Sequence, residues 1–239
     1  MEPVSKKLKV EDNSSTSSPE PFTQKGSHDE EVTLDFGEEK LYVPQFFLCL
    51  ASPVFESMFR NEFREKKEKL VAMTGKSYED FLDFLLCIHP RYQKEVNKLN
   101  VLRIVPLAEE YQVTAIVTKC KAVMKSMLSK AENKGSGAHK DSQIEPLSEC
   151  FNVLKSAVSF NFTDISTLAV KSIAKFGYCW YNDVDYDKFV IFTTYGGNKP
   201  DKGEARKECQ ALFESLPLET RYNILSERLK QVNDNGFKS

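Results

Sequence analysis

Cys87 and His89 lie close enough in sequence to suggest a metal site or a thiol nucleophile. We expect a helix here, on which side chains two positions apart point about 200° away from one another. The sequence offers no second pair for the remaining ligands of a zinc site. We therefore predict that Cys87 packs in the core and that His89 lies at the surface.

Asp183, Asp185 and Asp187 have the spacing that opens an EF-hand calcium loop. The pattern then fails, because Lys188 stands where the loop needs Gly and Thr194 stands where it needs Glu. We predict a turn or helix-start cluster here. Neither this segment nor the Cys87 segment predicts a metal ion or a cofactor.

A serine or cysteine nucleophile needs a base held beside it. His28 lies in a polar tail, His89 at an expected helix end and His139 in an expected linker, and these are the three histidines of the chain. The sequence also has no Gly-rich phosphate-binding loop. It therefore predicts no catalytic residue, and we do not expect an enzyme.

Composition narrows the class of partner. A formal net charge of -2 gives no electrostatic case for nucleic acid or a membrane surface. No apolar run approaches the ~20 residues that a membrane span needs, and residues 1–10 lack the apolar segment of a signal peptide. The six cysteines are scattered, as is typical of reduced thiols, so we expect the nucleus, the cytoplasm or both.

The stretch from Val32 to Phe59 contains the elements expected to organise the rest of the chain. Residues 32–36 and 41–43 predict a hairpin around a turn that contains Gly37. Five apolar residues then crowd one side of a helical turn: Phe46, Phe47, Leu48, Leu50 and Ala51. Ser52 is placed to cap a second helix, with Pro53 at its first position.

The later segments predict mostly helices. Residues 70–73 suggest a short strand, and Ser77 can cap a helix that ends at His89. Leu99, Leu102 and Val105 begin another helix, and residues 113–127 carry a long amphipathic stripe. Strands early and helices late predict an α+β fold.

An ordered set of these residues resembles a BTB/POZ domain. The set comprises Val32–Leu34, Tyr42–Val43, Leu48, Ala51–Phe55, Met58–Phe59, Leu107–Val113 and Cys120. It covers about Glu30 to Ser129, a little under half of the chain, and departs from the family at Pro44, where His is usual. The resemblance implies an α+β BTB/POZ fold, a short β-sheet capped by helical hairpins, followed here by an all-α extension.

The resemblance also implies partners. BTB adaptors for a cullin 3-type scaffold often carry a hydrophobic-x-Glu motif just beyond a Met-Phe pair. Met58 and Phe59 are followed here by Phe63, Arg64 and Glu65, so these five residues are the implied cullin-binding site. In the alternative, the Phe63 ring folds back onto the core and the Glu65 carboxylate is only solvated. The family resemblance further implies a homodimer, formed largely through the first helices.

Segments outside this domain differ in kind. Residues 1–29 are too polar to fold and predict a disordered tail, in which Lys6, Lys7 and Lys9 resemble a nuclear-import signal or are simply solvated. Residues 130–145 predict a flexible linker, and residues 146–239 a helical extension. Within the extension, four aromatic residues predict either core or an exposed substrate surface: Tyr178, Trp180, Tyr181 and Tyr186.

The two helical regions share a weak internal sequence repeat. Residues 111–114 (Tyr-Gln-Val-Thr) align with residues 160–163 (Phe-Asn-Phe-Thr), and each set follows an Ala three residues earlier. We predict that the same helix-turn-helix unit is used twice.

Together these features predict a protein–protein interaction module. The leading hypothesis is a homo-oligomeric substrate adaptor for a cullin 3-type ubiquitin ligase, with an unknown protein substrate and with no nucleic acid or membrane partner. The alternative is a nuclear scaffold or transcription cofactor that oligomerises through the same domain without binding a ligase.

Overall fold

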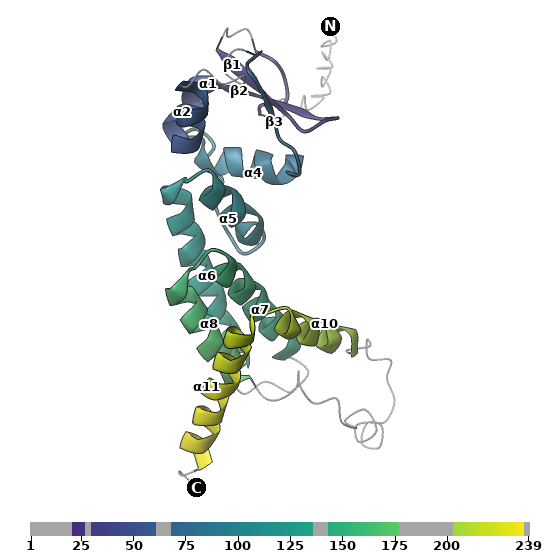
Figure 1. The fold of residues 1–239 in the computed structure, drawn as a ribbon, viewed down its shortest axis with the longest axis vertical. Helices are drawn as coiled ribbons and strands as arrows, with labels where there is room; N and C mark the ends of the chain where they lie inside the picture. Colours follow the sequence, from purple (N-terminus) through teal and green to yellow (C-terminus); the bar gives the residue numbers. More distant parts are fainter. Residues whose placement is uncertain (1–20, 27–29, 61–67, 136–142, 177–202, 237–239) are drawn as a thin grey trace, which may run out of the picture.

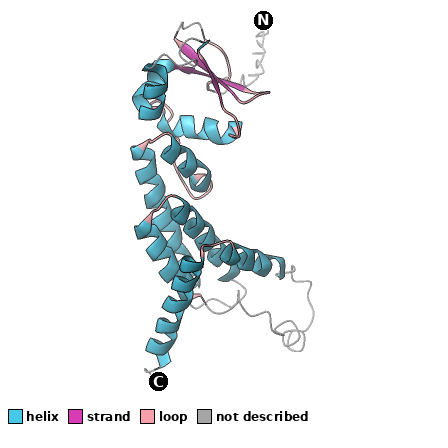
Figure 2. Ribbon diagram, viewed as in Figure 1, coloured by secondary structure: helices cyan, strands magenta, loops and turns pink. Residues whose placement is uncertain are grey.

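The computed structural model describes residues 21–26, 30–60, 68–135, 143–176 and 203–236. These residues form an elongated stack of helices, with a small sheet at one end and α11 at the other (Figure 1). The elements in chain order are β1 (Glu31–Asp35), β2 (Lys40–Pro44), α1 (Gln45–Ala51), α2 (Pro53–Arg60), β3 (Leu70–Ala72), α4 (Tyr78–Ile88), α5 (Val101–Glu110), α6 (Thr114–Gly135), α7 (Ile144–Ser159), α8 (Thr163–Lys175), α10 (Gly203–Glu214) and α11 (Leu218–Gly236). Figure 2 shows that the described strands all belong to the N-terminal end, which confirms the predicted α+β class.

β1 is the central strand of the sheet. It pairs antiparallel with β2 and parallel with β3, so the strand order is β2-β1-β3. The register sets Val32 opposite Val43 and Leu34 opposite Leu41, and all four side chains are fully buried. Gly37 supplies the turn at a φ of +99°, a conformation that a side chain would strain. The predicted hairpin is therefore confirmed.

Ser52 joins α1 and α2 to a distant part of the chain. Its hydroxyl accepts the N–H of Phe55 at 3.2 Å, which caps α2 as predicted. The same hydroxyl donates to the carbonyl of Tyr111 at 2.6 Å, across 59 positions of sequence. The rings of Phe55 and Tyr111 stack beside this bond with centroids 4.5 Å apart. The first helices are thus fixed to the end of α5.

The segment before α5 differs from the prediction. We expected Leu99 to begin a helix, but α5 begins at Val101 and Leu99 is 77% exposed. Asn97 accepts the N–H of Leu99 at 2.9 Å through its side-chain oxygen, and Asn100 accepts the N–H of Asn97 at 2.8 Å. These side chains compete for backbone N–H groups that a helix would use, so the chain makes a turn here.

The predicted internal repeat is confirmed, because the α5–α6 and α7–α8 turns have the same backbone conformation and the same hydrogen bonds. Gln112 and Asn161 both adopt the left-handed conformation, with φ of +54° and +55°. The next N–H in each turn bonds to the carbonyl of Ala108 or Ala157, at 2.8 Å in both cases. This is the Schellman helix end, in which a left-handed residue lets the chain reverse into the next helix. The sequence repeat therefore encodes one helical hairpin used twice.

Two further helices complete the stack, with α10 packed on α7 and α11 packed on α8. The Phe213 ring of α10 lies edge-on to the Phe151 ring of α7, with centroids 6.3 Å apart. On α11, Ile224 is fully buried, and the Arg228 guanidinium donates to the carbonyls of Ala174 and Phe176 at the end of α8. The helical extension thus continues the stacking that begins with α5 and α6.

The predicted linker 130–145 is partly helical. Helix α6 continues to Gly135 and α7 begins at Ile144, with Ala131 and Ile144 both buried. Buried apolar side chains favour helix at both ends of this polar segment, which composition alone did not show.

Candidate partner-binding surfaces

Helix α1 divides its apolar residues between two faces. Phe47 and Leu48 are buried, whereas Phe46 is 69% exposed and Leu50 is 74% exposed. Phe46 and Leu50 are four positions apart, so they lie on the same face of the helix. The sequence predicted one crowded apolar side, and the structure shows instead that the helix has an apolar face on the outside of the molecule. Such a face is typical of an interaction surface.

The predicted cullin-binding residues fall into two groups. Met58 is half-buried against the core, and Phe59 is buried with its ring stacked on Phe55 at 6.2 Å. Phe59 therefore holds the end of α2 against the domain. Phe63, Arg64 and Glu65 lie outside the described residues and remain predictions.

Three other predictions also lie outside the described residues. They are the aromatic set Tyr178, Trp180, Tyr181 and Tyr186, the basic residues Lys6, Lys7 and Lys9, and the three aspartates at 183, 185 and 187.

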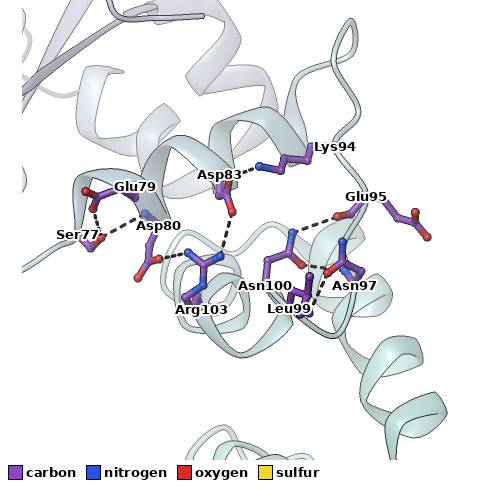
Figure 3. A network of polar contacts seen from close by, with 10 residues as sticks. All are labelled: Ser77, Glu79, Asp80, Asp83, Lys94, Glu95, Asn97, Leu99, Asn100 and Arg103. Atoms are coloured by element: carbon purple, nitrogen blue, oxygen red, sulfur yellow. Dashed lines mark hydrogen bonds and ion pairs between the residues drawn. The ribbon is translucent and has the colours of Figure 1, made fainter. Parts of the chain in front are cut away.

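A network of ion pairs fixes α4 against α5 (Figure 3). The Arg103 guanidinium contacts the carboxylates of Asp80 and Asp83, and the Asp83 carboxylate also pairs with the Lys94 ammonium. Asn100 donates to the carbonyl of Glu95 at 3.1 Å in the same view. The network orients the turn that exposes Leu99. No local sequence pattern indicates this network, because its members come from separate segments.

His89 lies in an aromatic cluster that sequence reasoning missed. Its ring centroid is 5.5 Å from Phe22, 4.9 Å from Phe47 and 4.8 Å from Tyr92. The ring nitrogen Nδ1 accepts the N–H of Arg91 at 3.1 Å. Burial, and secondly the charge of Arg91, lower the pKa of His89 below its usual value. The imidazole is therefore neutral at physiological pH and serves as packing.

The cysteines of the described residues have no partner that would activate them. Burial raises the pKa of Cys87 to about 11, which keeps its thiol protonated and unreactive. Among the described residues, no group of three or more His, Cys, Asp or Glu side chains is placed to hold a metal ion. Within the same parts of the chain, none of the helices combines the length and the apolar character that crossing a membrane requires.

Comparison with known proteins identifies the N-terminal region. Residues 22–128 match the family model of the BTB/POZ domain. This chain contains a BTB/POZ domain. The match begins at Phe22, whose carbonyl accepts the N–H of Tyr42 on β2 at 2.8 Å and whose ring lies beside His89. The structural resemblance expected from Ala51–Phe55 and Leu107–Val113 is thereby confirmed.

Two curated relatives from Caenorhabditis elegans also match this domain. The protein named BTB and MATH domain-containing protein 38 is 30% identical over 90 residues, which are 38% of this chain and 23% of the relative. BTB and MATH domain-containing protein 36 is 25% identical over 105 residues, 44% of this chain and 32% of the relative. The chain thus spans about a third or less of each relative. A BTB/POZ domain is a protein–protein interaction module, and this chain carries one.

Proposed function

We propose that this protein is a homo-oligomeric substrate adaptor for a cullin 3-type ubiquitin ligase. The BTB/POZ domain binds the cullin and a second copy of the chain, and the helical extension holds the protein substrate. No catalytic role is proposed for the chain. In the residues that the structure describes, the histidine and cysteine side chains at positions 49, 87, 89, 120, 150 and 209 pack against other side chains.

The exposed pair Phe46 and Leu50 is the observation that carries the proposal of an interaction module. An aromatic ring and a branched aliphatic chain of this size each gain about 1.5–3 kcal/mol on full burial. Two such residues on one short helix therefore supply a hot spot if a partner covers them. A two-fold dimer that pairs α1 with α1 covers both copies of the pair at once. We assign homodimerisation to this face.

The segment after α2 supports the cullin part of the proposal. α2 ends at Arg60, and Phe59 and Phe55 anchor this part of the helix in the core. Phe63 and Glu65 follow within five positions. An aromatic side chain supplies affinity by burial in a partner's pocket, and a nearby carboxylate guides orientation and association rate. Met58 and Phe59 contribute by positioning this segment.

A capture experiment tests the cullin part. The purified N-terminal domain of the cullin is immobilised and offered wild-type protein, Phe63→Ala, Glu65→Lys and the control Lys66→Ala. We expect wild type and Lys66→Ala to bind with equal affinity. The affinity of Phe63→Ala and of Glu65→Lys should fall at least about tenfold, since the loss of one hot-spot residue costs more than about 1.4 kcal/mol of binding free energy. No capture of the wild type, or equal capture of Phe63→Ala, would contradict the adaptor role.

The second candidate is a nuclear scaffold or transcription cofactor without a ligase. The basic run of Lys6, Lys7 and Lys9 favours it, because such runs serve as nuclear-import signals. Failure of wild-type capture together with nuclear accumulation that is lost on deletion of residues 1–29 would favour this candidate. The aromatic residues around Trp180 stay the predicted substrate surface in either case.

A further inference from the structure

Helix α11 has an apolar stripe that no described part of the chain covers. Four of its side chains are exposed: Leu218 by 75%, Tyr222 by 68%, Leu225 by 38% and Leu229 by 64%. Their spacing is four, three and four positions, which places them on one face of a helix. This is the pattern of a helix that packs against another helix along its length.

The other side of α11 already has its partner. Ile224 is fully buried, and Arg228 bonds to the end of α8. At 100° per residue, Ile224 lies more than 100° around the helix from the centre of the stripe. The stripe is therefore separate from the contact with α8. It lies on the last described helix of the stack, whose contact with the rest of the described chain is made mainly with α8.

The geometry points to a second copy of this chain as the occupant, with the two α11 helices antiparallel. The four positions are symmetric about a point between Tyr222 and Leu225. An antiparallel pair therefore sets Leu218 against Leu229 of the second copy, and Tyr222 against Leu225 of the second copy. Each copy offers the same surface, as a two-fold interface requires. Figure 1 shows that the C-terminal part of α11 extends beyond the rest of the stack.

Charge on the flank of the stripe favours the antiparallel direction. Glu219 lies near the start of α11 and Lys230 near its end, on the same side of the helix, with Lys230 also 3.7 Å from Glu227. In a parallel two-fold pair the two copies of this flank lie on opposite sides of the interface, so neither Glu219 nor Lys230 meets its counterpart. An antiparallel pair brings each Glu219 toward the end of the other helix that carries Lys230.

This contact lies at the opposite end of the molecule from α1 (Figure 1). It rests on different residues from the homodimer proposed above, so either contact can fail without the other. Two separate two-fold contacts at opposite ends join copies into an open row, because neither contact closes the assembly. The protein is then an assembly that grows with concentration and presents many copies of its substrate surface.

Sedimentation velocity over a wide concentration range tests the stripe. The full-length variants are Tyr222→Glu with Leu229→Glu, the matched control Asn223→Glu on a different face of α11, and Phe46→Glu with Leu50→Glu. We expect the wild type and Asn223→Glu to grow beyond a dimer, each double variant to stop at a dimer, and their combination to sediment as a 27.3 kDa monomer. Equal masses for the α11 double variant and Asn223→Glu would overturn the inference. That result is expected if a different protein, instead of a second copy of this chain, covers the stripe.

Cysteine crosslinking tests the direction of pairing. Leu218→Cys and Leu229→Cys are oxidised separately and as an equal mixture, with the wild type as the baseline for native cysteines. In an antiparallel pair the two copies of position 218 lie about 16 Å apart along the axis, too far for a disulfide. We expect a crosslinked dimer above baseline only in the mixture. Crosslinking of either variant alone, or none in any sample, would contradict the antiparallel contact.

Discussion

Ser52→Ala is the substitution that tests most sharply how the domain is held together. The buried Ser52 hydroxyl makes two bonds, one to the N–H of Phe55 and one to the carbonyl of Tyr111. Removing it deletes a helix cap, which costs about 1 kcal/mol. It also leaves the Tyr111 carbonyl without this donor in a buried setting, which costs about 1–3 kcal/mol. We expect a total loss of about 2–4 kcal/mol in the free energy of unfolding.

Ser77→Ala is the matched control, because Ser77 caps α4 through the N–H of Asp80 at 3.3 Å but is exposed and makes no long-range bond. Its expected cost is about 0.5–1 kcal/mol. Urea unfolding followed by circular dichroism measures both variants. With a slope of about 2 kcal/mol per M, Ser52→Ala should lower the urea midpoint by about 1–2 M, and Ser77→Ala by about 0.5 M or less. Equal midpoints for the two variants would contradict a stabilising role for the bond between Ser52 and Tyr111.

Two further predictions concern the helix ends and pH. Gln112→Gly should stabilise the protein by about 0.5 kcal/mol or more, because glycine adopts a positive φ without strain. Asn161→Gly should stabilise it less, since asparagine tolerates this conformation. Urea midpoints measure both variants, and a lower midpoint for either would contradict the turn geometry. The pKa of His89 is lowered on folding, so the unfolded chain binds the extra proton first and stability should fall as pH drops from 7 through about 6.5, the ordinary histidine value. His89→Gln should flatten that fall, and an unchanged pH profile would show that His89 does not contribute.

Local patterns carried most of what could be predicted about the fold. The hairpin around Gly37, the cap at Ser52 and the repeated turn at Gln112 and Asn161 depend on neighbouring residues, so the sequence encodes them directly. The parallel pairing of β1 with β3 joins residues about 37 positions apart, Thr33 with Leu70, and nothing local specifies it.

The surfaces were harder to predict because exposure is a property of the whole chain. Phe46 and Phe47 are adjacent and equally apolar, and only the packing of α1 against α2 and the sheet decides that Phe46 faces outward. Leu99 looked like the start of a helical stripe until the hydrogen bonds of Asn97 and Asn100 placed it in a turn. His89 was predicted to be a surface residue, yet rings from three other positions surround it.

We propose that the protein works through contacts made by its exposed α1 face. Sedimentation velocity of the double variant Phe46→Glu with Leu50→Glu tests this proposal. The control is Leu99→Glu, which places a glutamate on an equally exposed leucine elsewhere in the domain. We expect the α1 double variant to form a smaller assembly than the wild type, and Leu99→Glu to form an assembly of the same mass as the wild type. An α1 double variant with the mass of the wild type at every concentration would contradict it.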